Sequence, residues 1–95
     1  MFDFKFEWDE DKNKANQRKH GISFNEAAQI FDDDDAIYRP DLENSKHEDR
    51  FIIIGFSEKS RLLFVCHCFR DDYSIVRIIS ARKAKKKEIN EYMRR

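Results

Sequence analysis

The chain has 95 residues, of which 40% are apolar and 40% charged. It is long enough for one hydrophobic core and too short for two, so we expect a single domain over residues 1–95 with a strongly ionic surface. The formal net charge is zero, but residues 1–50 hold 8 Lys/Arg against 14 Asp/Glu, whereas residues 51–95 hold 11 against 5. This asymmetry predicts one surface suited to phosphates and another suited to a cationic partner.

Neither a membrane segment nor an export signal is expected. No apolar run approaches the roughly 18 residues of a membrane-spanning helix. The N-terminal residues alternate charged with aromatic side chains, unlike a signal peptide. Cys66 and Cys68 lie two apart on a predicted strand, which is poor geometry for a disulfide. Free thiols of this kind indicate the cytoplasm.

The first third of the chain predicts a strand and then a helix. Residues 2–8 alternate aromatic and charged side chains with a period of two, which is typical of a half-buried strand. Asp9 is a suitable N-cap and Gly21 a suitable left-handed C-terminal residue. We therefore expect a helix over Glu10–His20.

The helix over Glu10–His20 has little apolar surface. Ala15 is almost its only apolar residue, and it shares a face with Asn16 and Lys19. One hypothesis is a solvated helix that is held by its neighbours. The other is that Lys19 and His20 overhang a ligand site.

A second helix follows directly. Ser23 and Glu26 form an S-x-x-E capping box. Apolar residues at i, i+3, i+4 and i+7 from Phe24 to Phe31 predict one stripe that faces the core. The aspartates at 32–35 are expected to end this helix in a solvated turn.

The rest of the chain predicts strands and a final helix. Ala36–Arg39 is typical of a short edge strand closed by Pro40. Three further strands joined by short loops are expected over Phe51–Phe56, Leu62–Phe69 and Ser74–Ser80, and a helix over 83–95. The pattern predicts an α+β fold: a compact single domain with an antiparallel β-meander sheet, two N-terminal helices and a C-terminal helix.

Two arginines mark the last strand. Arg77 interrupts the β-branched run Ser74–Ser80, where an arginine is costly unless it has a partner or a task. On a regular strand Arg77 and Arg82 point to opposite faces, with Ser80 beside Arg82. We therefore expect them to act on different groups, unless the strand bends or twists near Ser80.

The residues can be compared with the needs of a metal-independent ribonuclease, and they support the cation role better than any particular acid or base. Such an enzyme needs a group that deprotonates the ribose 2′-OH, a group that protonates the leaving oxygen, and cations where charge builds on the phosphate. The candidate proton-transfer groups are His20, Glu48 and His67. The candidate phosphate-binding residues are Arg77, Arg82, Arg50 and Lys19. Arg50 has an alternative partner in Glu48, two residues earlier.

No cofactor and no metal site are expected. With only two glycines, a glycine-rich phosphate loop is excluded. Cys66, His67 and Cys68 lie on one predicted strand, which turns the thiols to one face and the imidazole to the other. No second ligand pair lies at zinc spacing, so we expect a buried structural role for all three.

Several motifs resemble the BrnT family of bacterial toxins from type II toxin–antitoxin pairs. They are F-E-W-D (Phe6–Asp9), N-Q-R-K-H-G-I-S-F (Asn16–Phe24) followed by E-A-A-Q-I-F, E-D-R-F-I-I-I-G (Glu48–Gly55) and R-I-I-S-A-R-K-A (Arg77–Ala84). The last is the most telling, and Glu88 and Tyr92 follow it. The match runs in order over nearly the whole chain.

The resemblance implies a RelE-like, microbial-RNase-like fold and an endoribonuclease activity that arrests translation. RNA, free or on ribosomes, is then the substrate. A co-encoded ribbon-helix-helix antitoxin is the partner, and DNA is reached only through that antitoxin. The resemblance places the site around Arg82, Arg77, Arg50 and Glu48, with Lys19 and His20 as further candidates. We expect the antitoxin to cover this basic site and to contact the acidic half.

Two other functions stay open on the residues alone. A non-catalytic RNA- or ribosome-binding module would use the same cations, and a protein-interaction subunit would use the charge asymmetry for assembly. In an enzyme, Arg82→Ala or Arg77→Ala abolishes cleavage while RNA binding falls modestly. In a binder, affinity and its salt dependence fall together.

Overall fold

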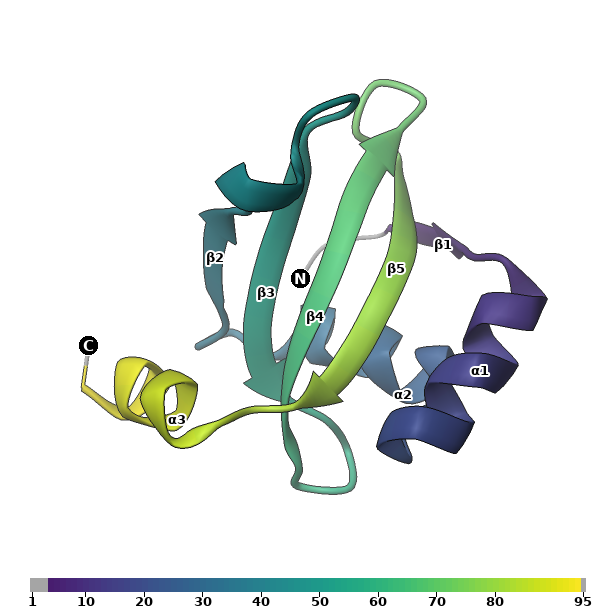
Figure 1. Cartoon of the computed structure of the whole chain (residues 1–95). Coiled ribbons are helices and arrows are strands. Elements are labelled where there is room, and N and C mark those ends of the chain that lie inside the picture. The colour runs from purple at the N-terminus through teal and green to yellow at the C-terminus, as the bar shows by residue number, and fades with distance from the viewer. Residues whose placement is uncertain (1–3, 95) are drawn as a thin grey trace.

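The fold is a five-stranded sheet that carries two helices on one face and a third helix at one corner of the other (Figure 1). The computed structural model describes residues 4–94. The strands are β1 (Lys5–Glu7), β2 (Ile37–Pro40), β3 (Arg50–Phe56), β4 (Leu62–Arg70) and β5 (Ile75–Lys83). The helices are α1 (Glu10–His20), α2 (Phe24–Gln29) and α3 (Lys86–Met93), with 3₁₀ turns at Ile30–Asp32 and Leu42–Asn44.

The strands lie in the order β1-β5-β4-β3-β2. The four strands β2 to β5 pair antiparallel with their sequence neighbours, which confirms the predicted meander and the α+β class. β1 pairs parallel with β5, so Glu7 lies opposite Arg77. The N-terminal strand therefore completes the edge beside the last strand, although Phe2 lies outside the described residues. The RelE-like likeness stays a prediction.

The helix-covered face of the sheet holds the main core. Here Ile53, Val65 and Val76 are fully buried against Phe24 of α2 and Ile30 of the 3₁₀ turn. The aromatic side of β1 joins this core, as its alternation predicts. Apolar side chains of the sheet and of the two helices fill this face.

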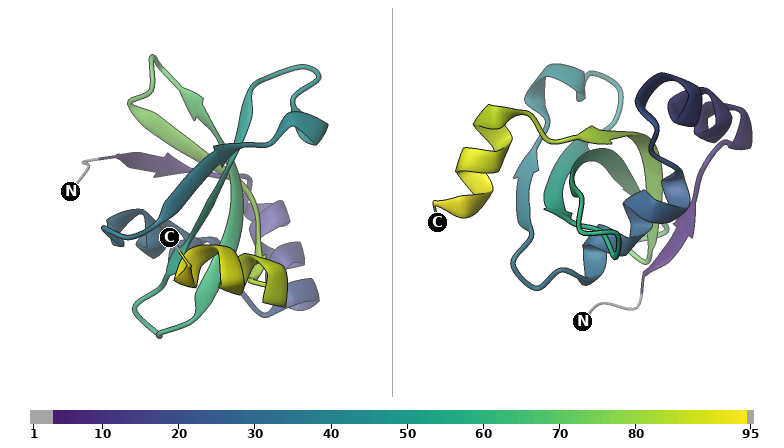
Figure 2. Two further views of the ribbon diagram at one scale, coloured as in Figure 1. Left: turned by 90° about the vertical axis from the view of Figure 1, so that its left-hand side faces the viewer. Right: turned by 90° about the horizontal axis from the view of Figure 1, so that it is seen from below.

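The other face, which we call the open face, carries Ile52, Ile54 and Cys66 under Tyr92 of α3. The Tyr92 hydroxyl donates to Asp33 Oδ2 at 2.8 Å, which ties α3 to the turn after α2. Figure 2 shows α3 on one side of the curved sheet and α1 and α2 on the other. Because α3 covers only a corner, the remainder of the open face is accessible.

Several boundaries differ from the sequence prediction. β5 continues to Lys83, because β4 still pairs with it there. The helix predicted from residue 83 begins at Lys86. α2 ends at Gln29 and tightens into a 3₁₀ turn, beyond which Asp33 Oδ2 accepts the Phe56 N–H at 2.8 Å.

The capping box of α2 is only half formed. Ser23 Oγ accepts the Glu26 N–H at 3.0 Å as predicted. The Glu26 carboxylate is drawn away to Ser57 and Arg61, and Arg61 holds the pKa of this buried carboxyl below its usual value. A tertiary ion pair thus replaces the local hydrogen bond.

Candidate functional site

A β-bulge interrupts β5 at Ile79. Cys66 of β4 pairs with Ser80, and the next residue, His67, pairs with Ile78. Ile79 is therefore an extra residue between two paired ones. Such a bulge shifts the alternation of side chains between the two faces by one residue. Two side chains that a regular strand would point to opposite faces can then point to the same face.

The bulge brings Arg77 and Arg82 onto the same face. Arg77 lies opposite Cys68 and Arg82 opposite Phe64, and these two β4 residues both point to the open face. The expectation for a regular strand, that the two arginines point to opposite faces, is therefore wrong. The exception left open for a bend near Ser80 is what occurs.

Arg82 is held in one orientation from three sides. Its Nη1 and Nη2 donate to the two oxygens of Glu88 at 2.7 and 3.0 Å, and Nη1 also donates to the Lys83 carbonyl at 3.2 Å. The guanidinium carbon stacks 3.9 Å from the centre of the Phe64 ring. Arg82 in turn holds the pKa of the buried Glu88 carboxyl below its usual value.

One edge of the Arg82 guanidinium stays unused. A guanidinium carries five N–H groups in a rigid fork. The contacts with Glu88 and Lys83 use both hydrogens of Nη1 and one of Nη2. Nε–H and the second Nη2–H have no partner among residues 4–94. These two groups are parallel, which suits two oxygens of a phosphate.

Arg77 and Arg50 flank Cys68 in one row across the sheet. Arg77 Nη1 donates to Glu7 Oε2 of β1 at 2.8 Å, so the parallel edge strand supplies the partner that an arginine at this position needs. Both arginines are about one-third exposed.

Glu48 lies between two arginines. It is 3.6 Å from Arg50 Nε and 3.3 Å from Arg70 Nη1, which confirms the predicted pairing of Glu48 with Arg50. The buried Nε of Arg50 has no hydrogen-bond partner in the described part of the chain. Because this atom is buried, it is not accessible to a ligand, and the Glu48 carboxylate lies 3.6 Å from it.

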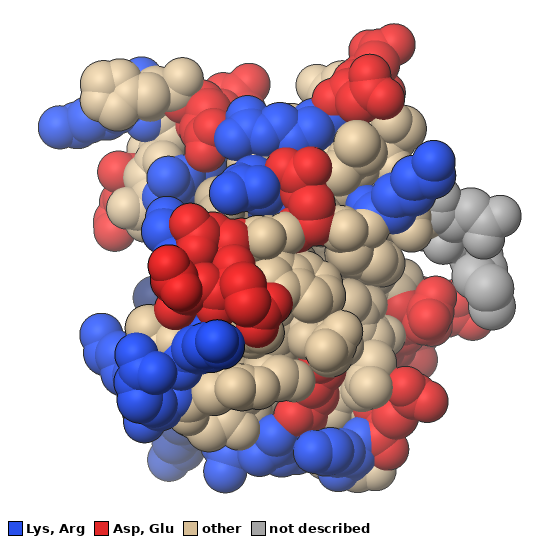
Figure 3. Space-filling model, turned by 90° about the vertical axis from the view of Figure 1, so that its right-hand side faces the viewer, with Lys and Arg blue, Asp and Glu red and all other residues tan. Residues whose placement is uncertain are grey.

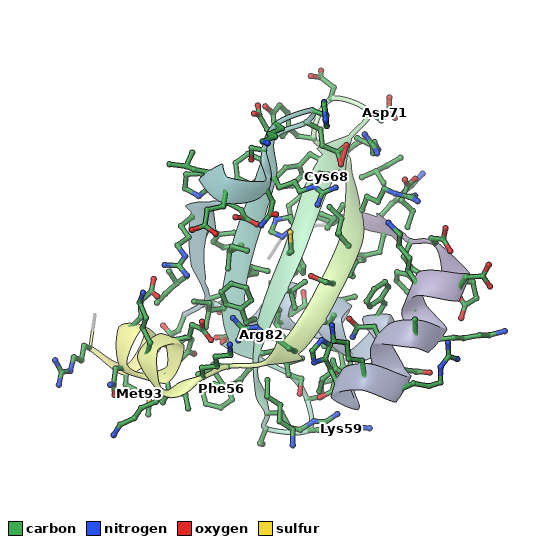
Figure 4. All side chains as sticks on the ribbon, viewed as in Figure 1. Phe56, Lys59, Cys68, Asp71, Arg82 and Met93 are labelled. Carbon is green, nitrogen blue, oxygen red and sulfur yellow. The ribbon has the colours of Figure 1, made fainter. Side chains whose placement is uncertain are left out.

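The candidate residues thus form two groups on one face. In Figure 4, Arg82 lies near the lower end of the sheet and Cys68, which marks the row of Arg50 and Arg77, near the upper end. Phe64 and Cys68 are four residues apart on β4, which corresponds to roughly 13 Å. A short stretch of RNA can reach both groups.

Helix α1 is docked by amides. Asn16 Nδ2 donates to the carbonyls of Ile22 and Ala81 at 2.9 and 2.8 Å, and its Oδ1 accepts the Ala81 N–H at 3.2 Å. Asn13 Oδ1 accepts the Phe24 N–H at 2.9 Å. Ala15, in contrast, is exposed. The helix is therefore held by its neighbours, as one hypothesis expected, but through buried polar groups.

This docking places Lys19 and His20 at the site. They line a hollow of about 330 Å³ together with Ser80, Arg82 and Phe64. The hypothesis that Lys19 and His20 overhang a ligand site is thus compatible with the way α1 is held. Arg82, Lys19 and His20 form the lower group, and Arg77, Arg50 and Glu48 form the upper group.

His67 does not belong to either group. It points to the helix-covered face, where its ring is fully buried and packs against Phe31, Phe51 and Phe69. Burial lowers the pKa of His67 to about 4. The proposal of His67 as a proton-transfer group is wrong, because the sheet separates its ring from the candidate phosphate-binding side chains.

The two cysteines are buried, as predicted. Both are buried on the open face, and burial raises the pKa of Cys66 to about 12 and raises that of Cys68. Their thiols are therefore protonated at neutral pH. In the range 4–94, no group of three or more His, Cys, Asp or Glu side chains is placed to hold a metal ion.

Three residues of the site were not predicted. Asn16 could have been suspected, because a helix without apolar residues must dock through something else. Glu88 stands three residues after the N-cap Lys85, at the position where an acid caps a helix, and its oxygen accepts the Lys85 N–H at 2.7 Å. The stacking role of Phe64 has no local signal, since it depends on pairing between β4 and β5.

The surface charge is patchy. Figure 3 shows the side on which α1 lies, where Lys and Arg gather separately from Asp and Glu around a central area of uncharged residues. No continuous basic field covers this view. The cations of the site therefore act locally, beside acids that orient them.

The comparison with known families decides the identity. A family described as "Ribonuclease toxin, BrnT, of type II toxin-antitoxin system" matches residues 8–88. The chain belongs to the BrnT family. This match confirms the resemblance drawn from the four motifs, and it makes the protein a ribonuclease toxin of a type II toxin–antitoxin system.

A solved BrnT structure supports the same conclusion. The fold is similar to that of the Brucella abortus ribonuclease toxin BrnT, with 26% sequence identity and a TM-score of 0.67. The similarity covers 87% of this chain and 99% of the Brucella chain. No curated protein matches the sequence. Within the described residues, no helix has both the length and the apolar character needed to cross a membrane.

Proposed function

We propose that this BrnT-family toxin is a metal-independent endoribonuclease, acting as one domain over residues 1–95 in the bacterial cytoplasm. It cleaves RNA and thereby arrests translation until an antitoxin binds. The observation that carries this proposal is the hollow in which the free edge of Arg82 lies beside Lys19 and His20. Cations and an imidazole in one hollow are the parts that phosphodiester cleavage requires.

The reaction is an attack of the ribose 2′-oxygen on the adjacent phosphorus. The O2′–P bond forms while the P–O5′ bond breaks, which leaves a 2′,3′-cyclic phosphate and a 5′-hydroxyl. One group removes the 2′-OH proton, and another supplies a proton to the leaving 5′-oxygen. Negative charge builds on the non-bridging oxygens, so cations must lie beside them.

The lower group supplies the cations and one of the two proton-transfer groups. Arg82 binds two phosphate oxygens through Nε–H and Nη2–H, and Lys19 adds a second positive charge. His20 carries one of the two proton transfers, and the other is not assigned to a residue. Its place at the end of α1, followed by the left-handed Gly21 (φ 71°), turns the chain away and keeps the imidazole at the rim of the hollow.

The upper group binds the flanking backbone. Arg77 and Arg50 contact a neighbouring phosphate, while Glu48 orients Arg50. The separation of the two groups along β4 suits successive parts of one RNA strand. This division assigns binding to the upper group and chemistry to the lower group.

The partner that silences the toxin is a ribbon-helix-helix antitoxin. It covers the arginines of the open face and makes further contacts with the acidic first half of the chain, which is suited to a basic segment. DNA is bound by the antitoxin and not by the toxin.

The test is cleavage of labelled total RNA in EDTA by the wild type, Arg82→Ala and Arg94→Ala. Arg94 is an exposed arginine at the end of α3 and serves as the matched control. We expect cleavage by the wild type and Arg94→Ala, 2′,3′-cyclic phosphate ends, and no cleavage by Arg82→Ala. Thermal unfolding of each variant checks that the fold is retained.

Intact RNA requires a second assay with translating ribosomes. Cleavage only in that assay places the substrate on the ribosome. Absence of cleavage in both assays overturns the enzyme proposal, and a loss of RNA affinity in Arg82→Ala without any cleavage by the wild type favours a binding module.

A further inference from the structure

A second hollow adjoins the proposed cleavage site across Phe64. Phe64 lines both hollows, and the second one extends from it toward the edge strand β2 and the start of α3. Its volume is about 350 Å³. Its lining includes the side chains of Arg39, Leu42, Glu43, Ile52, Phe64 and Lys87.

One aromatic ring connects the two hollows. The guanidinium carbon of Arg82 lies 3.9 Å from the centre of the Phe64 ring, and that of Arg39 lies 5.9 Å from it. Arg39 is fixed from its other side by Glu91 at 3.4 Å. A strand whose phosphate is bound by Arg82 therefore has its next nucleotide within reach of the second hollow.

The lining of this hollow suits a base better than a phosphate. Its two cations, Arg39 and Lys87, are balanced by Asp41 and Glu43, so the local charge does not favour an anion. It combines a planar guanidinium with the apolar side chain of Leu42, which is 82% exposed. Single-stranded RNA bases stack on arginine planes and apolar side chains of this kind.

Asp41 and Glu43 differ in whether their carboxylates already have hydrogen-bond partners. Asp41 Oδ2 accepts from Asn44 Nδ2 at 3.0 Å and from Cys66 Sγ at 3.6 Å. Glu43 is exposed, and its carboxylate has no partner in the part of the chain that the structure describes. A carboxylate only accepts hydrogen bonds, so it favours a base that carries an exocyclic amino group.

We propose that this hollow binds the nucleobase next to the cleaved bond, with Leu42 and Arg39 as the stacking surface and Glu43 as the residue that selects adenine, guanine or cytosine over uracil. The inference rests on the proposed function, because it takes RNA as the substrate. The phosphate-binding residues alone do not distinguish one RNA sequence from another. The inference adds a base preference to the site.

The test measures binding without cleavage. Fluorescein-labelled 2′-O-methyl hexanucleotides of A, of C and of U are titrated with the protein, and binding is followed by anisotropy. The 2′-O-methyl group removes the attacking hydroxyl, so affinity is read apart from activity. We expect the A and C oligomers to bind about 10-fold more tightly than the U oligomer, in line with one selected base.

Two variants and two matched controls locate the effect. Leu42→Ala should weaken binding of all three oligomers about 5- to 10-fold, because a stacking surface is lost. Glu43→Gln should bring the three affinities close together, since a carboxamide can also donate to uracil. Met93→Ala and Glu58→Gln change an exposed apolar and an exposed acidic residue outside the hollow, and they should change nothing.

The outcomes separate this proposal from the one on which it rests. Equal binding of A, C and U by the wild type, or unchanged binding by Leu42→Ala, overturns the base site even where RNA cleavage depends on Arg82. Variants that lose antitoxin binding but keep RNA affinity also overturn it. No binding and no cleavage of any RNA by the wild type overturns the proposed function itself.

Discussion

The side-chain amide of Asn16 binds both the N–H and the carbonyl of Ala81, at 3.2 and 2.8 Å. β1 pairs with β5 only as far as Arg77, so within residues 4–94 the edge of β5 beyond that residue has no neighbouring strand. The Asn16 amide makes the two hydrogen bonds to the Ala81 backbone that a neighbouring strand would make. The contact fixes α1 against the segment that follows the bulge, and it thereby sets the position of Lys19 and His20 relative to Arg82.

Replacing Asn16 with Ala should destabilise the protein by about 2–3 kcal/mol, because buried backbone groups lose their partners. Urea unfolding followed by circular dichroism measures this loss. Gln17→Ala, an exposed change one residue along the same helix, is the control and should cost less than about 0.5 kcal/mol. Equal stability of the two variants would mean that the amide does not anchor the helix.

Glu88→Gln tests whether the ion pair orients Arg82 for phosphate binding. The variant keeps the shape of the side chain but weakens the charge-assisted bonds, so we expect a loss of about 2 kcal/mol in stability. We also expect kcat for RNA cleavage to fall about 10-fold with little change in KM, because a mobile guanidinium stabilises the transition state less well. A fall in stability with unchanged kcat would limit Glu88 to a structural role.

Arg50→Ala should affect binding more than chemistry. Its pair with Glu48 is partly exposed, so its loss should change stability by less than about 1 kcal/mol. RNA affinity should fall severalfold, and the dependence of log K on log[salt] should become shallower by about 0.7, the value for one phosphate contact on a single strand. A large fall in kcat at saturating RNA would instead place Arg50 in the catalytic group.

His67 should make the fold sensitive to mild acid. Its pKa is about 4 in the folded protein against an ordinary value of 6.5, so the unfolded chain binds the proton first as the pH falls. The stability due to the neutral ring is complete above pH 6.5 and declines by about 3 kcal/mol as the pH falls to 4. Chemical denaturation at a series of pH values measures this slope.

The control for this slope is His67→Leu, which removes the titrating group from the core. Its stability should be nearly flat between pH 6.5 and 4.5. Glu26 and Glu88 have pKa values below their ordinary 4.5, so the stability they contribute is lost only at lower pH. A variant with the same slope as the wild type would show that other groups cause the acid sensitivity.

The antitoxin should depend on the open face. The double variant Arg77→Ala/Arg82→Ala should weaken capture of the co-expressed antitoxin at least 10-fold in a pull-down, because two positive charges at the centre of the interface are removed. Arg18→Ala/Arg94→Ala, which removes two exposed arginines elsewhere, is the matched control. Undiminished capture by the first variant would mean that the antitoxin binds another surface.

Much of the fold follows from local sequence. Asp9 and Gly21 bound α1 at the predicted residues, since N-caps and left-handed glycines act on backbone groups a few residues away. The middle of the apolar run of β3, residues 52–55, is buried as its composition indicates, whereas Phe56 at its end is exposed. The order and type of nearly every element, and hence the α+β class, could be predicted for the same reason.

Tertiary structure alone decided how the site is assembled. The bulge at Ile79 arises from the register between β4 and β5, and a single extra residue there moves Arg77 and Arg82 to one face. The contact of Asn16 with Ala81 joins residues 65 positions apart, which no local pattern can specify. The sequence by itself determined which residues carry charge and which elements they lie on. Only the pairing of distant backbone groups determined which of those charges meet, because strand register is set by packing across the whole sheet.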